Sequence, residues 1–303
     1  MSLISLLIAL FSDKHLSGNA WQFENYFQRY IALFKKNKTL TSFDQSSLTY
    51  TVFLLLPPVA LFALLTFVGD GVLNLLISTL VLIVLLGCKT TRDRYRAYLD
   101  SAYRGDITTS EMNHLQLLED KNLPPLGFGQ ALVWLNYRYY IAIMIFFIFF
   151  GAAGALLYRL LTSVTEYHED CLADTNCDKD AVEQTFDEKH NEAFTAPNIS
   201  TGCTSYQDVL FYVDWLPVRI SALGYMFVGH FSKALPTWLD TVFNSKNKAN
   251  HEVLVDVAQQ SEDITVDSED CSAEPTLLVR LAKRNVLLIL SILSVLILAG
   301  IIH

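Results

Sequence analysis

Four stretches of this chain are apolar for long enough to cross a lipid bilayer, which takes roughly 17–25 residues of helix. They cover Tyr50–Val68, Val72–Cys88, Tyr140–Leu161 and Asn285–Ile302. With 52% hydrophobic and only 17% charged residues, the composition is typical of a membrane protein and not of a soluble domain. The sequence therefore predicts an all-α, polytopic helical membrane protein that forms a single membrane domain over residues 1–303.

Basic residues flank these stretches and predict their orientation, because cytoplasmic flanks are enriched in Lys and Arg. Such residues precede the first, third and last stretches and follow the second. The N-terminus is therefore expected in the cytoplasm and the C-terminus outside. Residues 163–205 are rich in Asp and Glu, and we expect them to form an acidic external loop.

This orientation requires one further crossing. The chain is expected outside at residue 205 and inside at residue 280, and residues 209–231 are the remaining apolar stretch between them. Asp214, Pro217 and Arg219 interrupt that stretch within the sequence DWLPVRIS. We therefore predict four clear transmembrane helices and a fifth, broken or re-entrant membrane segment. The five segments cover about 50–68, 72–88, 140–161, 209–231 and 285–302.

Three basic residues in and after the fifth segment would share one face of a helix. At 100° per residue, His230 and Lys233 lie within about 40° of Arg219, whereas Asp214 lies on the opposite side. Asp is a favoured N-cap and Pro is tolerated in the first turn, so the sequence predicts a helix break at Asp214. A charge in the bilayer interior costs about 2.5–3.5 kcal/mol and usually marks a site. A basic stripe beside a helix N-terminus suits an anionic ligand, above all a phosphate.

Asn136 and Arg138 could line the same site near the inner leaflet, because they lie in the sequence WLNYRYY directly before the third apolar stretch. The alternative interpretation is structural. In it, Asp214 caps a helix, Arg219 pairs with another carboxylate, and His230 and Lys233 sit at the cytoplasmic end. The aromatic residues around Arg138 then belong to the belt that forms at membrane interfaces.

Several other functions find no support in the sequence. The net charge of −9 does not favour nucleic acid as a partner. The histidines show no metal-ligand spacing and the five cysteines form no CxxC pair, so no metal site is predicted. P-loop, HExxH and GxSxG motifs are absent, and cofactors and catalytic residues stay unknown. Cys171, Cys177 and Cys203 fall in the acidic loop, where an oxidising compartment would favour one disulfide among them.

Two segments outside the apolar stretches have their own expected structures. The opening MSLISLLIALF is too short to span and lacks the basic region of a signal peptide, so we expect a helix that packs against the membrane or dips into it. Residues 246–284 begin basic and then turn acidic, which predicts a short cytoplasmic helix followed by a linker.

The sequence resembles the AmpE family of bacterial inner-membrane proteins. The resemblance is carried by RYRAYLDSAYRGD (Arg94–Asp106), QALVWLNYRYYIA (Gln130–Ala142) and VLFYVDWLPVRISALGYMFVGHFSKALPTW (Val209–Trp238). Residues 163–205 look like an insertion relative to shorter members. The resemblance implies a multi-pass regulatory protein that takes part in β-lactamase induction, the antibiotic response and peptidoglycan recycling. It also implies a functional link to the AmpD amidase and makes the outer compartment the periplasm.

The family is distantly similar to the CobD/CbiB membrane enzymes of cobalamin biosynthesis, which carry N-Y-I-P-A-R-L-T-A where this chain has DWLPVRISA. That likeness implies a shared anion-binding scaffold around Leu216–Ala222. It does not imply catalysis, because Asp214 replaces the Asn and the opening segment lacks the D-P-x-x-x-x-H-P pattern of those enzymes.

Three functions therefore compete. The first is a membrane regulator or sensor, possessing charged loops and no recognisable catalytic set. The second is a membrane-bound enzyme of the CobD/CbiB type that acts on a phosphorylated small molecule. The third is a transporter, for which a charge at a broken helix would also fit. We expect the regulator, with the lipid bilayer and an anionic or phosphorylated small molecule as its partners.

Overall fold

The computed structural model describes residues 2–15, 21–36, 47–69, 71–166, 204–243, 248–262 and 272–300. Within these ranges the regular structure is helical, as the sequence predicted. The first helices are α1 (Ser2–His15), α2 (Phe23–Lys36), α4 (Ser47–Val68), α5 (Val72–Leu85), α6 (Lys89–Tyr103) and α7 (Ile107–Asp120). They are followed by α8 (Phe128–Asn136), a π-helical turn η2 (Tyr137–Ile141), α9 (Ala142–Glu166), α11 (Thr204–Val228), α12 (Phe231–Phe243), α13 (Asn250–Gln260) and α14 (Ala273–Leu298).

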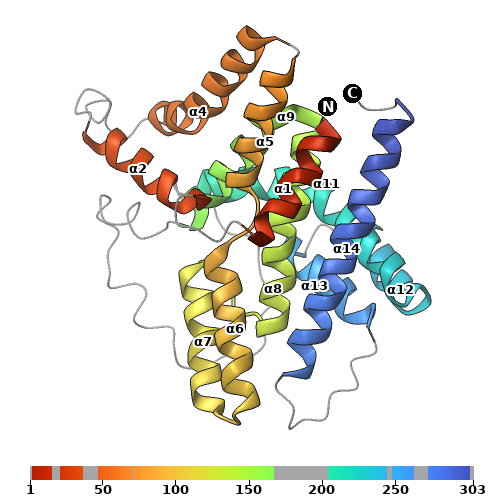
Figure 1. Cartoon of the computed structure of the whole chain (residues 1–303). Helices are drawn as coiled ribbons and strands as arrows, with labels where there is room; N and C mark the ends of the chain where they lie inside the picture. The colour runs from red at the N-terminus through yellow and green to blue at the C-terminus, as the bar shows by residue number, and fades with distance from the viewer. Residues whose placement is uncertain are drawn as a thin grey trace.

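Apolar and charged helices lie at opposite ends of the molecule. Figure 1 shows α4, α5 and α9 at one end and α6, α7 and the start of α14 at the other. Three helical stretches of the described chain are long and apolar enough to cross a membrane, namely Val72–Tyr103, Phe128–Glu166 and Ala273–Leu298. The prediction of a helical membrane protein is confirmed, while the exact number of crossings stays a prediction.

The chain bends where the apolar end meets the charged end. α5 is apolar and packs against α1, whose Leu6 and Ala9 are buried. Gly87 then adopts a φ of +73°, a left-handed conformation that favours glycine. Its N–H donates to the carbonyl of Tyr139 at 3.2 Å. This bend lets the polar helix α6 leave the apolar layer and pair with α7.

The stretch Tyr140–Leu161, which the sequence predicted to be one membrane-crossing helix, folds back on itself in the structure. Gly151 has φ +68° and ψ −167° inside α9, which breaks the helix into two arms. The hydroxyl of Tyr139 lies 2.9 Å from Glu166 Oε1, 27 residues away, whereas an unbroken helix would separate them by roughly 40 Å. The rings of Phe146 and Tyr158 also stack at 4.7 Å. α9 is therefore a helical hairpin whose two ends lie together.

This hairpin removes the reason for placing residues 163–205 outside the cell, because that prediction assumed one crossing. Asn122 Nδ2, directly after α7, donates to the carbonyl of Thr165 at 3.3 Å. The end of α9 thus lies on the same side as the end of α7. The acidic residues 167–203, with Cys171, Cys177 and Cys203, lie outside the described residues.

The predicted helix break at Asp214 is also wrong. α11 runs without interruption from Thr204 to Val228 through both Asp214 and Pro217. The break comes later, at Gly229, where an added Cβ would lie 2.2 Å from the carbonyl oxygen of Ser261. The N–H of His230 donates to that same oxygen at 2.7 Å.

Because of this later break, the basic residues of the predicted stripe do not share one helix. Arg219 lies on α11, His230 follows the break, and Lys233 belongs to α12. α11 is instead held by α13 and α14. Asn250 Nδ2 donates to the carbonyl of Phe211 at 2.7 Å, and Asn285 Nδ2 donates to the carbonyl of Ser221 at 3.1 Å.

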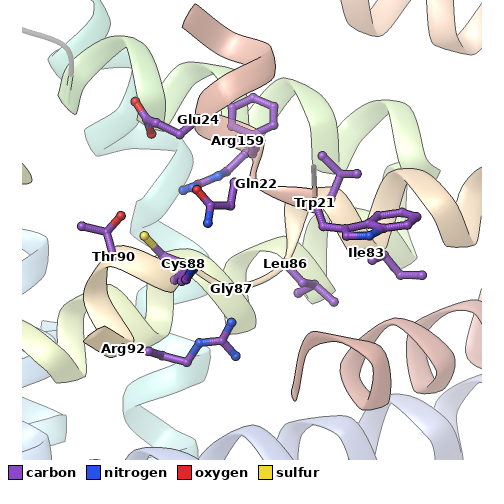
Figure 2. A pocket seen from close by; sticks show the side chains of 13 residues that line it. Trp21, Gln22, Glu24, Ile83, Leu86, Gly87, Cys88, Thr90, Arg92 and Arg159 are labelled. Atoms are coloured by element: carbon purple, nitrogen blue, oxygen red, sulfur yellow. The ribbon is translucent and has the colours of Figure 1, made fainter. Parts of the chain in front are cut away.

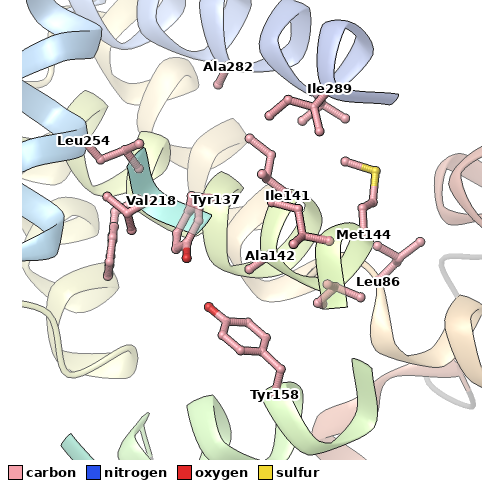
Figure 3. Close-up of a cluster of buried hydrophobic side chains, with 14 of the residues drawn as sticks. Leu86, Tyr137, Ile141, Ala142, Met144, Tyr158, Val218, Leu254, Ala282 and Ile289 are labelled. Atoms are coloured by element: carbon pink, nitrogen blue, oxygen red, sulfur yellow. The ribbon is translucent and has the colours of Figure 1, made fainter. Parts of the chain in front are cut away.

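The core is built around α8, η2 and the first arm of α9, because these segments are buried on nearly all sides. Figure 3 shows Ile141, Ala142 and Met144 among side chains from α5, α11, α13 and α14. Two tyrosine hydroxyls, of Tyr137 and Tyr158, point toward each other inside this apolar cluster. A further helix, α13 (Asn250–Gln260), lies within the segment 246–284, for which a short helix followed by a linker was predicted.

Candidate functional site

A buried ion pair joins the charged end of the molecule to the hairpin of α9. Lys121 Nζ, at the end of α7, lies 3.1 Å from Glu166 Oε2, and the two side chains are only 7% and 6% exposed. Tyr139 donates its hydroxyl to both oxygens of the same carboxylate, at 2.9 and 3.0 Å. Burial opposes the charged form of Lys121, but nearby Tyr139 and Glu166 outweigh it, so the pKa of Lys121 is raised. The amine therefore stays protonated.

Arg159 is a second cation in the same region, and its charge is only partly matched. Its side chain belongs to the second arm of α9 and the residue is 2% exposed. The guanidinium lies 4.2 Å from the ring centroid of Tyr139 and 5.3 Å from that of Phe23. Nε and Nη1 are buried and have no hydrogen-bond partner among the described residues. Glu166 lies within electrostatic range of Arg159, but its carboxylate is already bound by Lys121 and Tyr139.

A cavity opens beside Arg159, and we call it the junction pocket. It has a volume of about 40 Å³, enough for about three water molecules at 10–15 Å³ each. Figure 2 shows the Arg159 side chain among residues from the start of α2, the bend after α5 and the first turn of α6. The lining residues are Trp21, Gln22, Phe23, Glu24, Ile83, Val84, Leu86, Gly87, Cys88, Lys89, Thr90, Arg92 and Arg159.

Asp214 forms a separate buried centre inside the hairpin. Tyr137 and Tyr158 both donate their hydroxyls to Asp214 Oδ1, at 2.7 and 2.8 Å, and Asp214 is 2% exposed. The two tyrosines come from opposite arms of the structure around Gly151. The carboxylate of α11 therefore ties the two arms together and does not cap a helix.

Arg219 is held by its own helix. Its Nη1 donates to the carbonyl of Trp215 at 2.8 Å, and its guanidinium stacks on the ring of the same residue at 4.1 Å. Trp238 Nε1 of α12 reaches the carbonyl of Arg219 at 3.4 Å. The neighbouring Trp215 thus takes up part of the hydrogen-bonding capacity that the sequence assigned to an anionic ligand.

The structure brings some of the predicted site residues together and separates others. Arg138 lies over the ring of Trp134 at 4.9 Å and within electrostatic range of Asp214. Arg138 Nε and Asn136 Oδ1 are buried without a hydrogen-bond partner among the described residues. Arg138 and Asp214 thus belong to one region, while Arg219 faces Trp215.

Sequence reasoning missed Lys121, Arg159 and Glu166. The signal for Arg159 was present, because a lone arginine in the apolar run GAAGALLYRLL costs free energy unless it has a role. Lys121 and Glu166 carried no local signal, since their contact joins residues 45 positions apart.

Comparisons with known proteins match nearly the whole chain to one family. A family model described as regulatory signalling modulator protein AmpE matches residues 1–188 and 193–303. Residues 163–205, predicted to be an insertion, fall inside this match except for the few between its two parts. Protein AmpE of Shigella flexneri is 24% identical over 280 residues, which cover 85% of this chain and 84% of that protein.

No solved structure matches this chain. The family model, by contrast, matches the charged helices α6 and α7 as well as the apolar hairpin and the final helix α14. The match therefore includes every part of the site described above. With nearly its whole length covered, this chain belongs to the AmpE family of regulatory signalling modulator proteins.

Proposed function

We propose that this chain is a multi-pass regulatory protein of the bacterial inner membrane that takes part in β-lactamase induction and peptidoglycan recycling. Membership of the AmpE family and the apolar helices support a regulatory role in a membrane. The proposal includes the functional link to the AmpD amidase that the sequence resemblance implied.

The proposed orientation follows from the basic residues of the charged end. α6 carries Lys and Arg residues along its length, which favours the cytoplasm for α6, α7 and the start of α14. The C-terminal end of α14 then faces the periplasm. Figure 1 brings the first residues of α1 to that same end of the molecule, so the predicted cytoplasmic N-terminus does not fit this arrangement.

The observation that carries the proposal is the buried ion pair between Lys121 and Glu166. It joins α7, in the charged end, to the hairpin of α9, in the apolar end. Separating the two helices would leave a buried charge without its partner, which is strongly unfavourable. A change in the hairpin therefore has to move α7 with it, and this connection suits a protein that passes a signal from the membrane to a cytoplasmic surface.

An anionic ligand near the inner leaflet is also part of the proposal. The sequence placed this ligand around Arg219, with Asp214, His230, Lys233, Asn136 and Arg138. We propose the junction pocket instead, because a cavity opens beside Arg159 and two of its donors are unpartnered among the described residues, against one each in Arg138 and Arg219.

The proposal is tested in cells of the native host. The gene is deleted, and β-lactamase activity is measured by nitrocefin hydrolysis with and without an inducing β-lactam. We expect the deletion to change the ratio of induced to uninduced activity, and plasmid-borne wild type to restore it. Lys121→Met should fail to restore the ratio.

The matched control is Arg104→Gln, which breaks the exposed pair with Asp100 and should restore the ratio as wild type does. Membrane levels of each variant are followed by immunoblot, so that lost regulation is separated from lost protein. An induction ratio that is the same in the deletion strain and the wild-type strain contradicts the proposed function.

A further inference from the structure

The junction pocket combines two independent features that favour a bound anion. The first is the side chain of Arg159, which lines the pocket and is 2% exposed. Its Nε and Nη1 are buried and have no partner among the described residues. Arg159 also interacts with Tyr139, but its two unpartnered donors remain costly, because they have lost water and gained no hydrogen bond in return. An oxyanion in the pocket would supply the missing acceptors.

The second feature is the N-terminus of α6, which opens at the pocket. Cys88 is the N-cap and makes no side-chain capping bond, and Cys88, Lys89 and Thr90 line the cavity. The first N–H groups of a helix have no intrahelical acceptor, and the helix dipole adds a partial positive charge there. Such helix starts bind phosphate groups in many proteins. α6 has 15 residues, long enough for this effect.

The charges around the pocket agree with these two features. Lys89, Arg92 and Arg159 line it, and Glu24 is the one acidic residue among the lining residues. The nearby Glu166 is bound by Lys121 at 3.1 Å and does not neutralise Arg159 by a hydrogen bond that the structure shows. Arginine matches the geometry of phosphate oxygens with two parallel donors. The pocket thus offers two buried donors of Arg159, together with the partly buried amine of Lys89.

We propose that the junction pocket binds the phosphate group of a phosphomonoester or pyrophosphate, with Arg159 and the first turn of α6 as its principal donors. This inference rests on the proposed function, for which it names the chemistry of the ligand. The pocket lies where the apolar end meets the charged end, so the phosphate could belong to a soluble molecule or to a lipid headgroup. The chemistry of recognition is the same in both cases.

Binding is tested on the full-length protein purified in a mild detergent. Thermal unfolding is followed by tryptophan fluorescence while inorganic pyrophosphate is titrated against sodium chloride of equal ionic strength. We expect pyrophosphate to raise the unfolding temperature of the wild type. Arg159→Gln should raise the apparent dissociation constant by roughly 10- to 100-fold, because charged hydrogen bonds are lost. Arg159→Lys should bind with intermediate affinity.

The matched control is Arg96→Gln. Arg96 is exposed on α6 and does not line the pocket, so this variant should bind pyrophosphate as wild type does. If Arg159→Gln does not fold, Lys89→Gln and Arg92→Gln carry the test, because both side chains line the pocket and are only partly buried. An equal rise of the unfolding temperature with pyrophosphate in the wild type and the pocket variants contradicts the inference.

Native mass spectrometry of the same samples distinguishes the two sources of phosphate. An anionic phospholipid that stays bound to the wild type but not to Arg159→Gln identifies a lipid headgroup. Protection by pyrophosphate without bound lipid identifies a soluble ligand. If neither is observed, the inference is wrong. Binding is measured on purified protein and induction in cells, so a failure of the inference is distinguished from a failure of the proposed function.

Discussion

At the scale of single residues, aromatic rings partly replace the water that buried cations lose. Arg159 lies against Tyr139 and Phe23, and Lys121 Nζ lies 5.4 Å from the Tyr139 ring centroid. Such contacts contribute about 0.5–2 kcal/mol each, depending on desolvation. That is less than the cost of burying an unpaired charge, so an acceptor is needed as well. Lys121 has one in Glu166, whereas Nε and Nη1 of Arg159 have none among the described residues, and this difference is the basis for proposing a ligand there.

Lys121→Met should destabilise the protein by about 3–5 kcal/mol, because it leaves the buried carboxylate of Glu166 without its cation. The double variant Lys121→Met/Glu166→Gln should recover part of the loss, since no unpaired charge then remains. Unfolding in detergent by heat or denaturant measures both. Arg104→Gln is the control, because its exposed pair with Asp100 contributes only about 0.3–0.5 kcal/mol. An equal loss in Arg104→Gln would contradict the role given to burial.

His251 should make stability depend on pH. Burial beside Trp134 lowers the pKa of His251 below its usual 6.5, against the opposing effect of Glu252. The folded protein thus prefers neutral His251, whose contribution is present above pH 6.5 and is lost as pH falls through the lowered pKa. Asp256 and Arg138 also act on this ring.

We therefore expect the unfolding temperature to fall between pH 7 and pH 5, and to fall less in His251→Gln. The measurement is a series of thermal unfolding curves in detergent at several pH values. The effect of Asp106 on stability falls at a lower pH than that of His251. The hydrogen bond from Thr109 lowers the pKa of the Asp106 carboxyl below 3.8. Its contribution is lost only in more acidic solution. Parallel pH curves for wild type and His251→Gln would exclude His251 as the cause.

At the scale of elements, the hairpin of α9 depends on one backbone position. Gly151 has φ +68° and ψ −167°, a combination that side-chain-bearing residues adopt only at a cost. Small residues such as those of GAAG often allow close helix packing in membranes. In the structure the first of these glycines provides the turn, and Tyr137 and Tyr158 secure the arms through Asp214.

Gly151→Ala should destabilise the protein by about 1–3 kcal/mol through backbone strain alone, since an added Cβ meets nothing within 4 Å. Gly71→Ala is the matched control. It also has free space around an added Cβ, but its φ of −167° is open to any residue. The two variants are compared by thermal unfolding in detergent. A similar small change in both would mean that α9 does not need the observed turn.

How far the sequence could predict these elements depended on the range of the interactions involved. The apolar runs that became α5 and α14 were recognisable because their composition alone determines their environment. The fold-back at Gly151 was not, since 22 apolar residues read the same whether they cross or return. Asp214 was predicted to cap a helix, and its actual partners Tyr137 and Tyr158 lie 77 and 56 residues away. Only the tertiary fold shows such contacts.

At the scale of the whole molecule, the hairpin changes the membrane topology. Glu166 returns to the side of Lys121, so we expect α9 to contribute no net crossing, although Phe128–Glu166 is long and apolar enough for one. A crossing at residues 209–231 is then no longer required by the predicted orientation. α11 packs against α13 and α14, and its Asp214 and Arg219 are buried within the protein.

Cysteine labelling in cells tests this topology. In a background where the five native cysteines are replaced by serine, Arg104→Cys and Thr165→Cys should react alike with a membrane-impermeant maleimide. We expect both to be protected in intact spheroplasts and labelled after lysis, because α7 and the end of α9 share one side. Leu298→Cys, at the far end of α14, should label in intact spheroplasts. Labelling of position 165 but not of position 104 before lysis would show that α9 crosses the membrane once.

The short reach of the hairpin also makes bilayer thickness a variable for this protein. From Tyr139, at the base of the hairpin, to the turn at Gly151 the first arm rises about 18 Å, roughly 60% of a 30 Å hydrocarbon core. Acyl chains of the opposite leaflet must fill the remaining depth beneath the turn. A thinner membrane compresses that lipid layer and a thicker one deepens it, with a mismatch cost of fractions of a kcal/mol per Å. Lipid composition can thus act mechanically on the arms that Asp214 holds together.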